Sequence, residues 1–325
     1  MFKYAKMKAV LCMSPSGASV YGSRKRYWYS VFKNWQLYMF LLPAFIYVIL
    51  FNYAPMYGVI MAFKNYSLRA GIMKSPWADP ILKNFKLFFD GRMFLDVLRN
   101  TVTISLYGLI AGFPFPILLA LMLNEVKSKR YMKFVQNVTY TPFFISTVVI
   151  VGMIKLFFTG SGIINSILAR FGVAPVLFLN QANYFPHLYI WSGIWQTVGY
   201  SSIIYFASLS GVPPELHEAA VIDGASRLRR IWHINLPHIR PTIVILLILD
   251  AGRIMNVGFE KIYLMQSSLN LTQSEVISTY IYKVGVTKSN FSLGAAVGLF
   301  NNIINMALLI LVNWVAGKIG ETSLF

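Results

Sequence analysis

Long apolar runs alternate with shorter polar segments along this chain. Six of the runs are long enough for a helix to cross the hydrocarbon core of a bilayer, which takes about 20 residues. They cover residues about 35–63, 100–123, 134–158, 185–209, 242–265 and 293–315. Backbone groups must be paired internally in lipid, so runs of this length predict transmembrane helices. The expected fold is all-α: a polytopic membrane protein with six spans, whose transmembrane domain covers residues 35–318.

A polar segment, residues 212–241, separates the fourth and fifth runs. Its pattern predicts two short helices. The first begins at Pro213, since the fixed φ of proline suits a helix start, and it ends at Gly224. The second begins after Ser226, a suitable N-cap, and it ends at Pro237. Such a helix–turn–helix is also compatible with an amphipathic loop that lies on the membrane surface.

Composition supports the membrane assignment. Apolar residues make up 57% of the 325 residues and charged residues only 12%, with a mean hydropathy of +0.59. Soluble domains carry about 25% charged residues. The net charge of +18 does not predict a nucleic-acid partner, because the lysines and arginines lie mostly between the apolar runs, where they set topology. The single cysteine, Cys12, excludes an internal disulfide framework, and no metal site is expected.

The distribution of Lys and Arg predicts the orientation of the spans. These residues are more numerous in the basic tail 1–34, the loop 124–133, the segment 212–241 and the C-terminal end than in the other loops. Cytoplasmic segments carry the excess of basic residues. We therefore expect segment 212–241, the N-terminal tail 1–34 and the C-terminal tail 319–325 in the cytoplasm.

Motifs for catalysis and for nucleotide binding are absent from the sequence. No G-x-x-x-x-G-K-[ST] loop is present to hold the phosphates of ATP. Neither H-E-x-x-H nor G-x-S-x-G occurs, so neither a zinc protease site nor a serine hydrolase site is indicated. We expect no catalytic residue, no enzyme activity and no cofactor in this chain.

Ionisable residues interrupt the fifth predicted span. Asp250, Arg253, Asn256 and Glu260 recur at intervals of three, three and four residues, which would place them on one face of a helix. Charges at membrane depth usually face a cavity or one another. The four residues are therefore candidates for a hydrophilic substrate pathway. The alternative is that Asp250 and Arg253 only neutralise each other.

Asparagines form a second polar stripe, in the sixth predicted span. They are Asn301, Asn302 and Asn305. Amide groups can hydrogen-bond to a hydroxyl-rich substrate, so these residues are further pathway candidates. Hydrogen bonding between helices is an equally good explanation.

The segment 212–241 also carries a longer motif. It consists of Glu218, Ala219 and Ala220, then Asp223 and Gly224, and finally Ile234, Leu236 and Pro237. This spacing resembles the EAA loop of the membrane subunits of ABC importers. Residues 57–68, 106–126 and 256–286 extend the resemblance to the carbohydrate permeases of this family, in the polysaccharide-type branch that includes the alginate importer.

The resemblance implies a heteromeric complex in a bacterial cytoplasmic membrane. A second homologous permease subunit, two ATP-binding cassette ATPase subunits and an extracytoplasmic solute-binding protein are the implied partners, besides membrane lipid and a carbohydrate substrate. ATP and Mg²⁺ would bind to the ATPase subunits. The loop would couple ATPase closure to the spans, and the implied coupling residues are Glu218, Ala219, Ala220, Asp223, Gly224 and Pro237.

The resemblance favours oligosaccharides or polysaccharides as the substrate, with alginate or its fragments first, and Arg253 as a carboxylate contact. Neutral oligosaccharides are the open alternative. A different class of transporter is also compatible with the intramembrane acids. In that alternative, a proton-coupled secondary transporter would use Asp250 and Glu260 as proton carriers.

Overall fold

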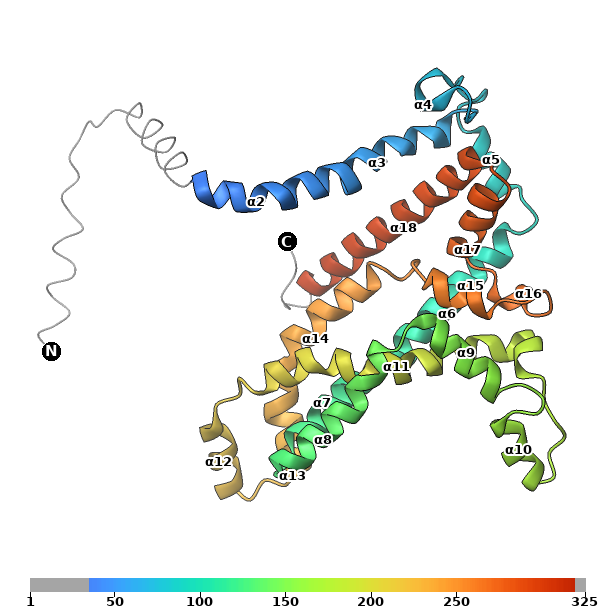
Figure 1. Cartoon of the computed structure of the whole chain (residues 1–325). Coiled ribbons are helices and arrows are strands. Elements are labelled where there is room, and N and C mark those ends of the chain that lie inside the picture. The colour runs from blue at the N-terminus through green and yellow to red at the C-terminus, as the bar shows by residue number, and fades with distance from the viewer. Residues whose placement is uncertain (1–34, 319–325) are drawn as a thin grey trace, which may run out of the picture. The chain divides into compact units, whose positions relative to one another are not determined.

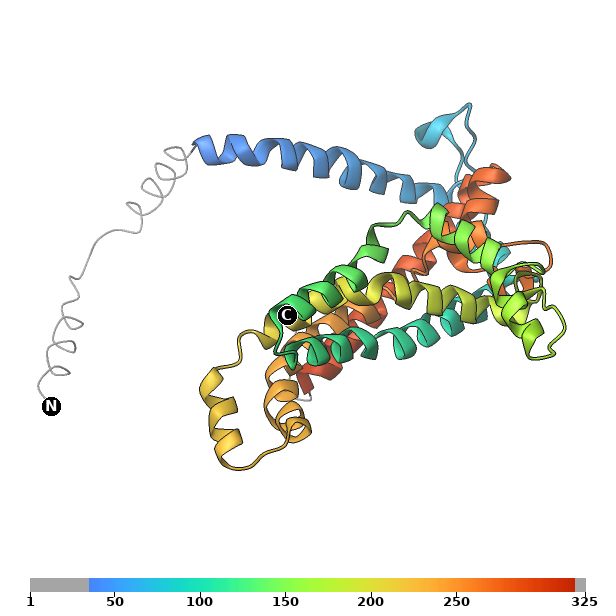
Figure 2. The same cartoon turned by 60° about the horizontal axis from the view of Figure 1, so that its bottom comes forward.

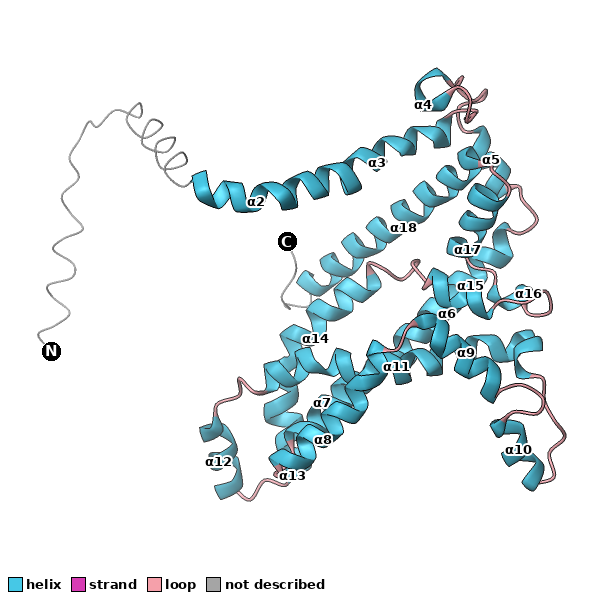
Figure 3. Cartoon of the chain, viewed as in Figure 1, coloured by secondary structure: helices cyan, strands magenta, loops and turns pink. Residues whose placement is uncertain are grey.

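The computed structural model describes residues 35–318, and the regular elements of that range are helices, apart from an isolated β-bridge between Lys64 and Trp77 (Figures 1 and 3). The all-α prediction is confirmed. The predicted tails, residues 1–34 and 319–325, lie outside the described residues. The chain divides into two compact units, one ending at Gly58 and the other beginning at Val59.

The described part of the first unit, from Trp35, is one helical run. It comprises α2 (Trp35–Val48), the π-helical turn η1 (Ile49–Tyr53) and α3 (Ala54–Met56), and the run continues as the 3₁₀ helix η2 (Tyr57–Phe63). The first predicted span, 35–63, coincides with this run. No residue of α2, η1 or α3 is buried within the chain.

The second unit contains the remaining helices. They are α4 (Gly71–Lys74), α5 (Lys83–Phe89), α6 (Phe94–Gly112), α7 (Pro114–Asn124), α8 (Lys129–Tyr140), η3 (Thr141–Phe144), α9 (Thr147–Phe157), α10 (Ile163–Arg170), η4 (Phe178–Asn180), η5 (Ala182–Tyr184), α11 (Phe185–Leu209), α12 (Pro214–Ile222), α13 (Arg227–Arg230), η6 (Ile231–Asn235), α14 (Leu236–Ala251), α15 (Phe259–Met265), α16 (Leu271–Ser274), α17 (Ile277–Tyr282), η7 (Lys283–Thr287) and α18 (Phe291–Lys318). In Figure 2, α11 and the run of α6 and α7 lie side by side.

Helix α11 organises this unit, because it packs against α6, α7, α8 and α14. Its approach to α8 depends on Gly199. A Cβ atom at that position would lie 2.0 Å from the carbonyl oxygen of Thr139, so no larger residue fits. The bounds of α11 match the fourth predicted span, 185–209.

Four helical runs of the described residues are both long and apolar enough to cross a membrane, and a bent pair makes a fifth. The four are Trp35–Phe63, Phe94–Asn124, Arg227–Ala251 and Phe291–Lys318. Helix α11 has 25 residues, so it is long enough to span, but its Ser, Thr, Gln and Gly residues keep it outside this apolar set. The count of six spans therefore stays a prediction.

The third predicted span, 134–158, is not one straight helix. The run Lys129–Phe144 and helix α9 meet at a bend of 97°. Pro142 lies at the start of the 3₁₀ turn that ends the first run, and Ile145 and Ser146 are extended. Ser146 then caps α9, since its Oγ accepts a hydrogen bond from the Val149 amide.

The fifth predicted span, 242–265, is wrong at both ends. The helix begins earlier, at Arg227, and it ends at Ala251, while α15 is a separate short helix. Pro237 does not end the second helix of the loop as predicted. The π-helical turn η6 precedes it, in which the Leu236 amide donates to the Ile231 carbonyl, and the helix continues through Pro237 into α14.

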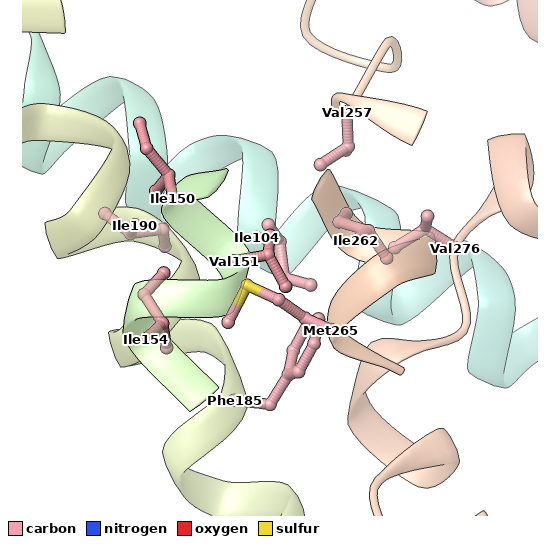
Figure 4. Close-up of a cluster of buried hydrophobic side chains, with 10 residues drawn as sticks. All are labelled: Ile104, Ile150, Val151, Ile154, Phe185, Ile190, Val257, Ile262, Met265 and Val276. Atoms are coloured by element: carbon pink, nitrogen blue, oxygen red, sulfur yellow. The ribbon is translucent and has the colours of Figure 1, made fainter. Parts of the chain in front are cut away.

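Buried apolar side chains hold α15 in place after the break. Ile262 and Met265 of α15 lie among Ile104 of α6, Ile154 of α9 and Phe185 of α11 (Figure 4). A second cluster joins α5, α6, α17 and α18 around Phe88 and Val297, and a third joins α7, α11 and α14 around Ile239. The break in the chain is thus flanked by packed helices on both sides.

Candidate functional site

The break between α14 and α15 overturns the expectation that Asp250, Arg253, Asn256 and Glu260 lie on one face of a single helix. Helix α14 ends at Ala251, and the chain then turns. The Arg253 amide donates to the Asp250 carbonyl at 3.0 Å, and the Asn256 amide donates to the Arg253 carbonyl at 2.8 Å. Helix α15 begins only at Phe259. Hence Asp250 belongs to α14, and Glu260 belongs to α15.

Two asparagines of α18 hold the broken backbone. Asn305 Oδ1 accepts a hydrogen bond from the Met255 amide at 3.0 Å. Asn256 Oδ1 accepts one from Asn301 Nδ2 at 2.8 Å and one from Asn305 Nδ2 at 3.1 Å. Asn301 and Asn305 are both buried. These bonds correspond to the interhelical role considered for the stripe, and a substrate contact stays a prediction.

Asn302 belongs to a different face of α18. Its side chain is exposed, unlike those of Asn301 and Asn305. The predicted stripe of three asparagines is therefore split by the helix, and only two of the three reach the break.

The four candidates of the fifth predicted span nevertheless line one cavity. Its volume is about 890 Å³, and its walls come from α6, α7, α9, α11, α14, the break and α15. Asp250, Arg253, Asn256 and Glu260 all contribute. Among the described residues, neither Asp250 nor Arg253 forms an ion pair within 4.0 Å, so these two residues do not neutralise each other through a close contact.

Hydroxyl and amide groups add to the polar lining of this cavity. Ser105 of α6 and Gln196, Thr197 and Ser201 of α11 lie on its wall. Gly108 also lies there with open space where a Cβ would stand, so it leaves room in the cavity. A cavity of this size with hydroxyl, amide and charged groups suits a hydrophilic organic ligand.

Sequence reasoning missed Lys261 as a residue of this cavity. Its side chain is only 9% exposed, and it lies on the cavity wall. Lys261 Nζ donates to the Tyr189 carbonyl at 3.2 Å and lies 5.3 Å from the centre of the Tyr189 ring. The intervals of three and four residues selected Glu260 and passed over its neighbour, because those intervals apply only to an unbroken helix.

The loop 212–241 begins with the predicted helix, α12. As predicted, the helix ends before Gly224, whose φ of +72° favours glycine. The Ala225 amide closes the end by donating to the Ala220 carbonyl at 2.8 Å. Ser226 then caps α13, where its Oγ accepts from the Arg229 amide. Figures 1 and 2 show α12 at the margin of the helices.

Most of the surface of α12 is exposed. None of its residues is buried, and the apolar side chains of Leu216, Val221 and Ile222 are 50%, 56% and 85% exposed. Glu218 and Ala219 are exposed as well, and Ala220 is half-buried. An exposed helix with apolar side chains is typical of a surface that contacts another protein.

The base of the loop contacts the end of α7. Arg230 Nη2 lies 3.8 Å from Glu125 Oε2. A cleft of about 480 Å³ lies between the segment 124–127 and the loop, and Glu218 and Arg227 are among its lining residues. The loop is therefore joined to the second and fifth predicted spans in the same chain.

Residues 112–321 match the family described as binding-protein-dependent transport system inner membrane component. Two relatives from Bacillus subtilis (strain 168) are each 40% identical. The polygalacturonan/rhamnogalacturonan transport system permease protein YteP aligns over 93% of this chain and 94% of its own length, and protein LplB over 89% and 91%. The chain belongs to this transport family.

A solved structure of a transporter has the same fold as this chain. It is the bacterial alginate ABC transporter in complex with an alginate pentasaccharide-bound periplasmic protein. One of its chains is 39% identical, with a TM-score of 0.84, and the match covers 92% of this chain and 100% of that one. The chain is therefore a permease component of an importer in the inner membrane and not an enzyme, which replaces the alternative of a proton-coupled carrier.

Proposed function

We propose that this permease imports acidic oligosaccharides, such as fragments of polygalacturonate or alginate. The observation that carries the proposal is the similarity, at 39–40% identity over about nine-tenths of the chain, to two proteins whose names specify acidic polysaccharides. The cavity agrees with this, since it combines hydroxyl and amide groups with the cationic side chains of Arg253 and Lys261. Carboxylates bind well to guanidinium and ammonium groups.

Loop 212–241 couples this permease to ATP hydrolysis in the proposed mechanism. Helix α12 inserts into a cleft of an ATPase subunit, where its exposed Leu216, Val221 and Ile222 are covered. Glu218 pairs with a basic group there, and Ala219 and Ala220 allow close approach. The helical run from Arg227 to Ala251 leads from the loop to the cavity wall, so displacement of the loop moves Asp250.

The complete transporter then contains a second permease subunit, two ATPase subunits that bind ATP and Mg²⁺, and an extracytoplasmic solute-binding protein. Loop 212–241 and both termini lie in the cytoplasm. The excess of Lys and Arg in the segments on that side supports this orientation. Sugar delivered from outside enters the cavity, and Asn256 and Arg253 contact it.

Transport by the reconstituted complex tests this function. Proteoliposomes that contain the permease with its genomic partner subunits and solute-binding protein should accumulate an oligogalacturonide or an alginate oligosaccharide when ATP is enclosed with the ATPase subunits. A neutral oligosaccharide of equal length should accumulate more slowly. ATP-dependent uptake of neutral sugars alone would overturn the acidic substrate class, and uptake driven by a proton gradient without ATP would overturn the importer mechanism.

A further inference from the structure

Lys261 carries an ammonium group in an uncommon setting. Its side chain is about nine-tenths buried, and it lies between α15 and α11. The interactions of its Nζ atom within the described chain are with the carbonyl oxygen and the aromatic ring of Tyr189. Both of these groups are uncharged, so the positive charge of Lys261 is not balanced by a bonded anion.

Other lysines with limited exposure show how this chain usually satisfies such a group. Lys283 pairs with the buried carboxylate of Glu275. Lys64 donates to two carbonyl oxygens, those of Ile72 at 2.8 Å and Met73 at 3.0 Å. An ammonium group has three N–H donors. Among the described residues, Lys261 has one hydrogen-bond acceptor, which leaves donors for a group that the chain does not supply.

The ammonium group of Lys261 lies beside a glycine of the cavity wall. This glycine is Gly193 of α11, and a Cβ atom on Gly193 would be 3.5 Å from Lys261 Nζ. Gly193 and Lys261 both line the large cavity. Because glycine has no side chain, nothing projects from this position to cover the ammonium group.

The charged groups that line the cavity determine which kind of ligand can bind there. Asp250 and Glu260 also line it, yet neither lies within 4.0 Å of a cationic side chain among the described residues. Arg253 supplies a second cation in the same cavity. A buried cation without an ion-pair partner is unfavourable, and an anionic ligand in the cavity removes that cost.

We propose that Lys261 binds the carboxylate of a uronate unit during its passage through the cavity and thereby selects acidic over neutral sugars. This rests on the proposed function and adds the residue that recognises the charge. The ammonium group donates to a carboxylate oxygen, while the Tyr189 carbonyl keeps its position. Arg253, which lines the same cavity, is available to another uronate unit of the oligomer.

The test uses the reconstituted complex and two sugars of equal length, one with carboxylates and one with neutral methyl esters. The solute-binding protein is saturated with oligogalacturonide or with its methyl ester, and this loading is measured separately. Uptake is then measured against the concentration of the loaded protein, which gives a KM for each sugar. The wild type should show a KM about tenfold lower for the acid than for the ester, as expected for one charge-assisted hydrogen bond. The Lys261→Met variant should lose this preference, and Lys261→Arg should keep most of it.

Lys155→Met is the matched control, since Lys155 is an exposed lysine of α9. It should leave the preference unchanged. A Lys261→Met complex that assembles normally and still prefers the acid by the wild-type factor would overturn the role of Lys261. So would an equal loss for both sugars together with lower thermal stability, which would mark a structural lysine. If the wild type transports neither sugar, the proposed function itself fails.

Discussion

Two points in the segment 227–265 differ in whether the helix continues through them. At Pro237 the sequence predicts the end of a helix, but the helix continues from Arg227 to Ala251. Between Ala251 and Phe259 the sequence has no proline, but there the helix ends. The presence of proline therefore does not decide where this part of the chain leaves the helical conformation.

The supply of hydrogen-bond partners explains the difference. Pro237 lacks only its own N–H, and the π-helical turn before it shifts the bonding by one residue, so that the helix continues. The same arrangement occurs in the first unit, where the π-helical turn Ile49–Tyr53 also ends two residues before a proline, Pro55. At the break, the Met255 amide instead finds a side-chain acceptor, Asn305 of α18.

The continuous helix and the break have different roles in the proposed mechanism. A continuous helix between the loop and the cavity transmits displacement, because a helix shortens or bends little under load. A broken segment exposes backbone and places Arg253 and Asn256 on the cavity wall. Non-helical backbone at membrane depth is stable only where it is buried in protein or lines such a cavity.

The largest effect is expected when the support of the break is removed. The Asn305→Leu variant leaves the buried Met255 amide without its acceptor, which should cost about 1–3 kcal/mol. The thermal stability of the purified complex should fall, and uptake should drop by about tenfold or more. The Asn302→Leu variant is the control on the same helix, because Asn302 is exposed. Equal behaviour of the two variants would contradict the assignment of Asn305 as the support.

Local patterns predicted the first helix and the turn of the loop, but not the course of the chain at Pro237. Pro213, Gly224 and Ser226 act within a few residues of their own positions, through a fixed φ, a positive φ and a cap. These effects depend on neighbours in sequence, so a single sequence is enough to read them. The apolar lengths likewise predicted the runs around α6–α7 and α18, because burial in lipid depends mainly on composition.

The break could not be predicted in this way. It depends on Asn305, which lies 50 residues after Met255 in the sequence. Lys261 was missed for the same reason, since its surroundings come from Tyr189 and Gly193 of α11. Helical spacing, which does not apply across the break, selected Asp250, Arg253, Asn256 and Glu260. These residues share the cavity because packed helices surround the break. Their contact with substrate stays a prediction.

A smaller effect, limited to coupling, is expected at the turn of the loop. The backbone of Gly224 has a φ of +72°, whereas proline is fixed near −65°. Gly224→Pro should therefore redirect α12 relative to α13 and should lower sugar-stimulated ATP hydrolysis about tenfold. The preference for acidic over neutral sugar should not change, because the cavity lies elsewhere in the chain. Gly172→Pro is a control, since Gly172 also has a positive φ, +77°, but follows α10. Normal coupling in Gly224→Pro would refute the role of the loop.

The smallest effect is expected at Pro237, where the helix is already continuous. Pro237→Ala restores an N–H and removes the clash that the π-helical turn avoids, so the turn should revert to an α-helix. The residues before it would then rotate relative to α14, and Arg230 would move away from Glu125.

Cross-linking measures this rotation. Glu125→Cys and Arg230→Cys are introduced into a chain whose single natural cysteine is replaced by Cys12→Ser, and the cross-linking yield with a short bifunctional thiol reagent is measured. The yield should fall severalfold in Pro237→Ala, while the stability of the complex should change by less than about 1 kcal/mol. Pro241→Ala is the matched control, because Pro241 lies within α14, beyond the π-helical turn. An unchanged yield in Pro237→Ala would show that the turn does not depend on its proline, and the contrast between the two points would then need another cause.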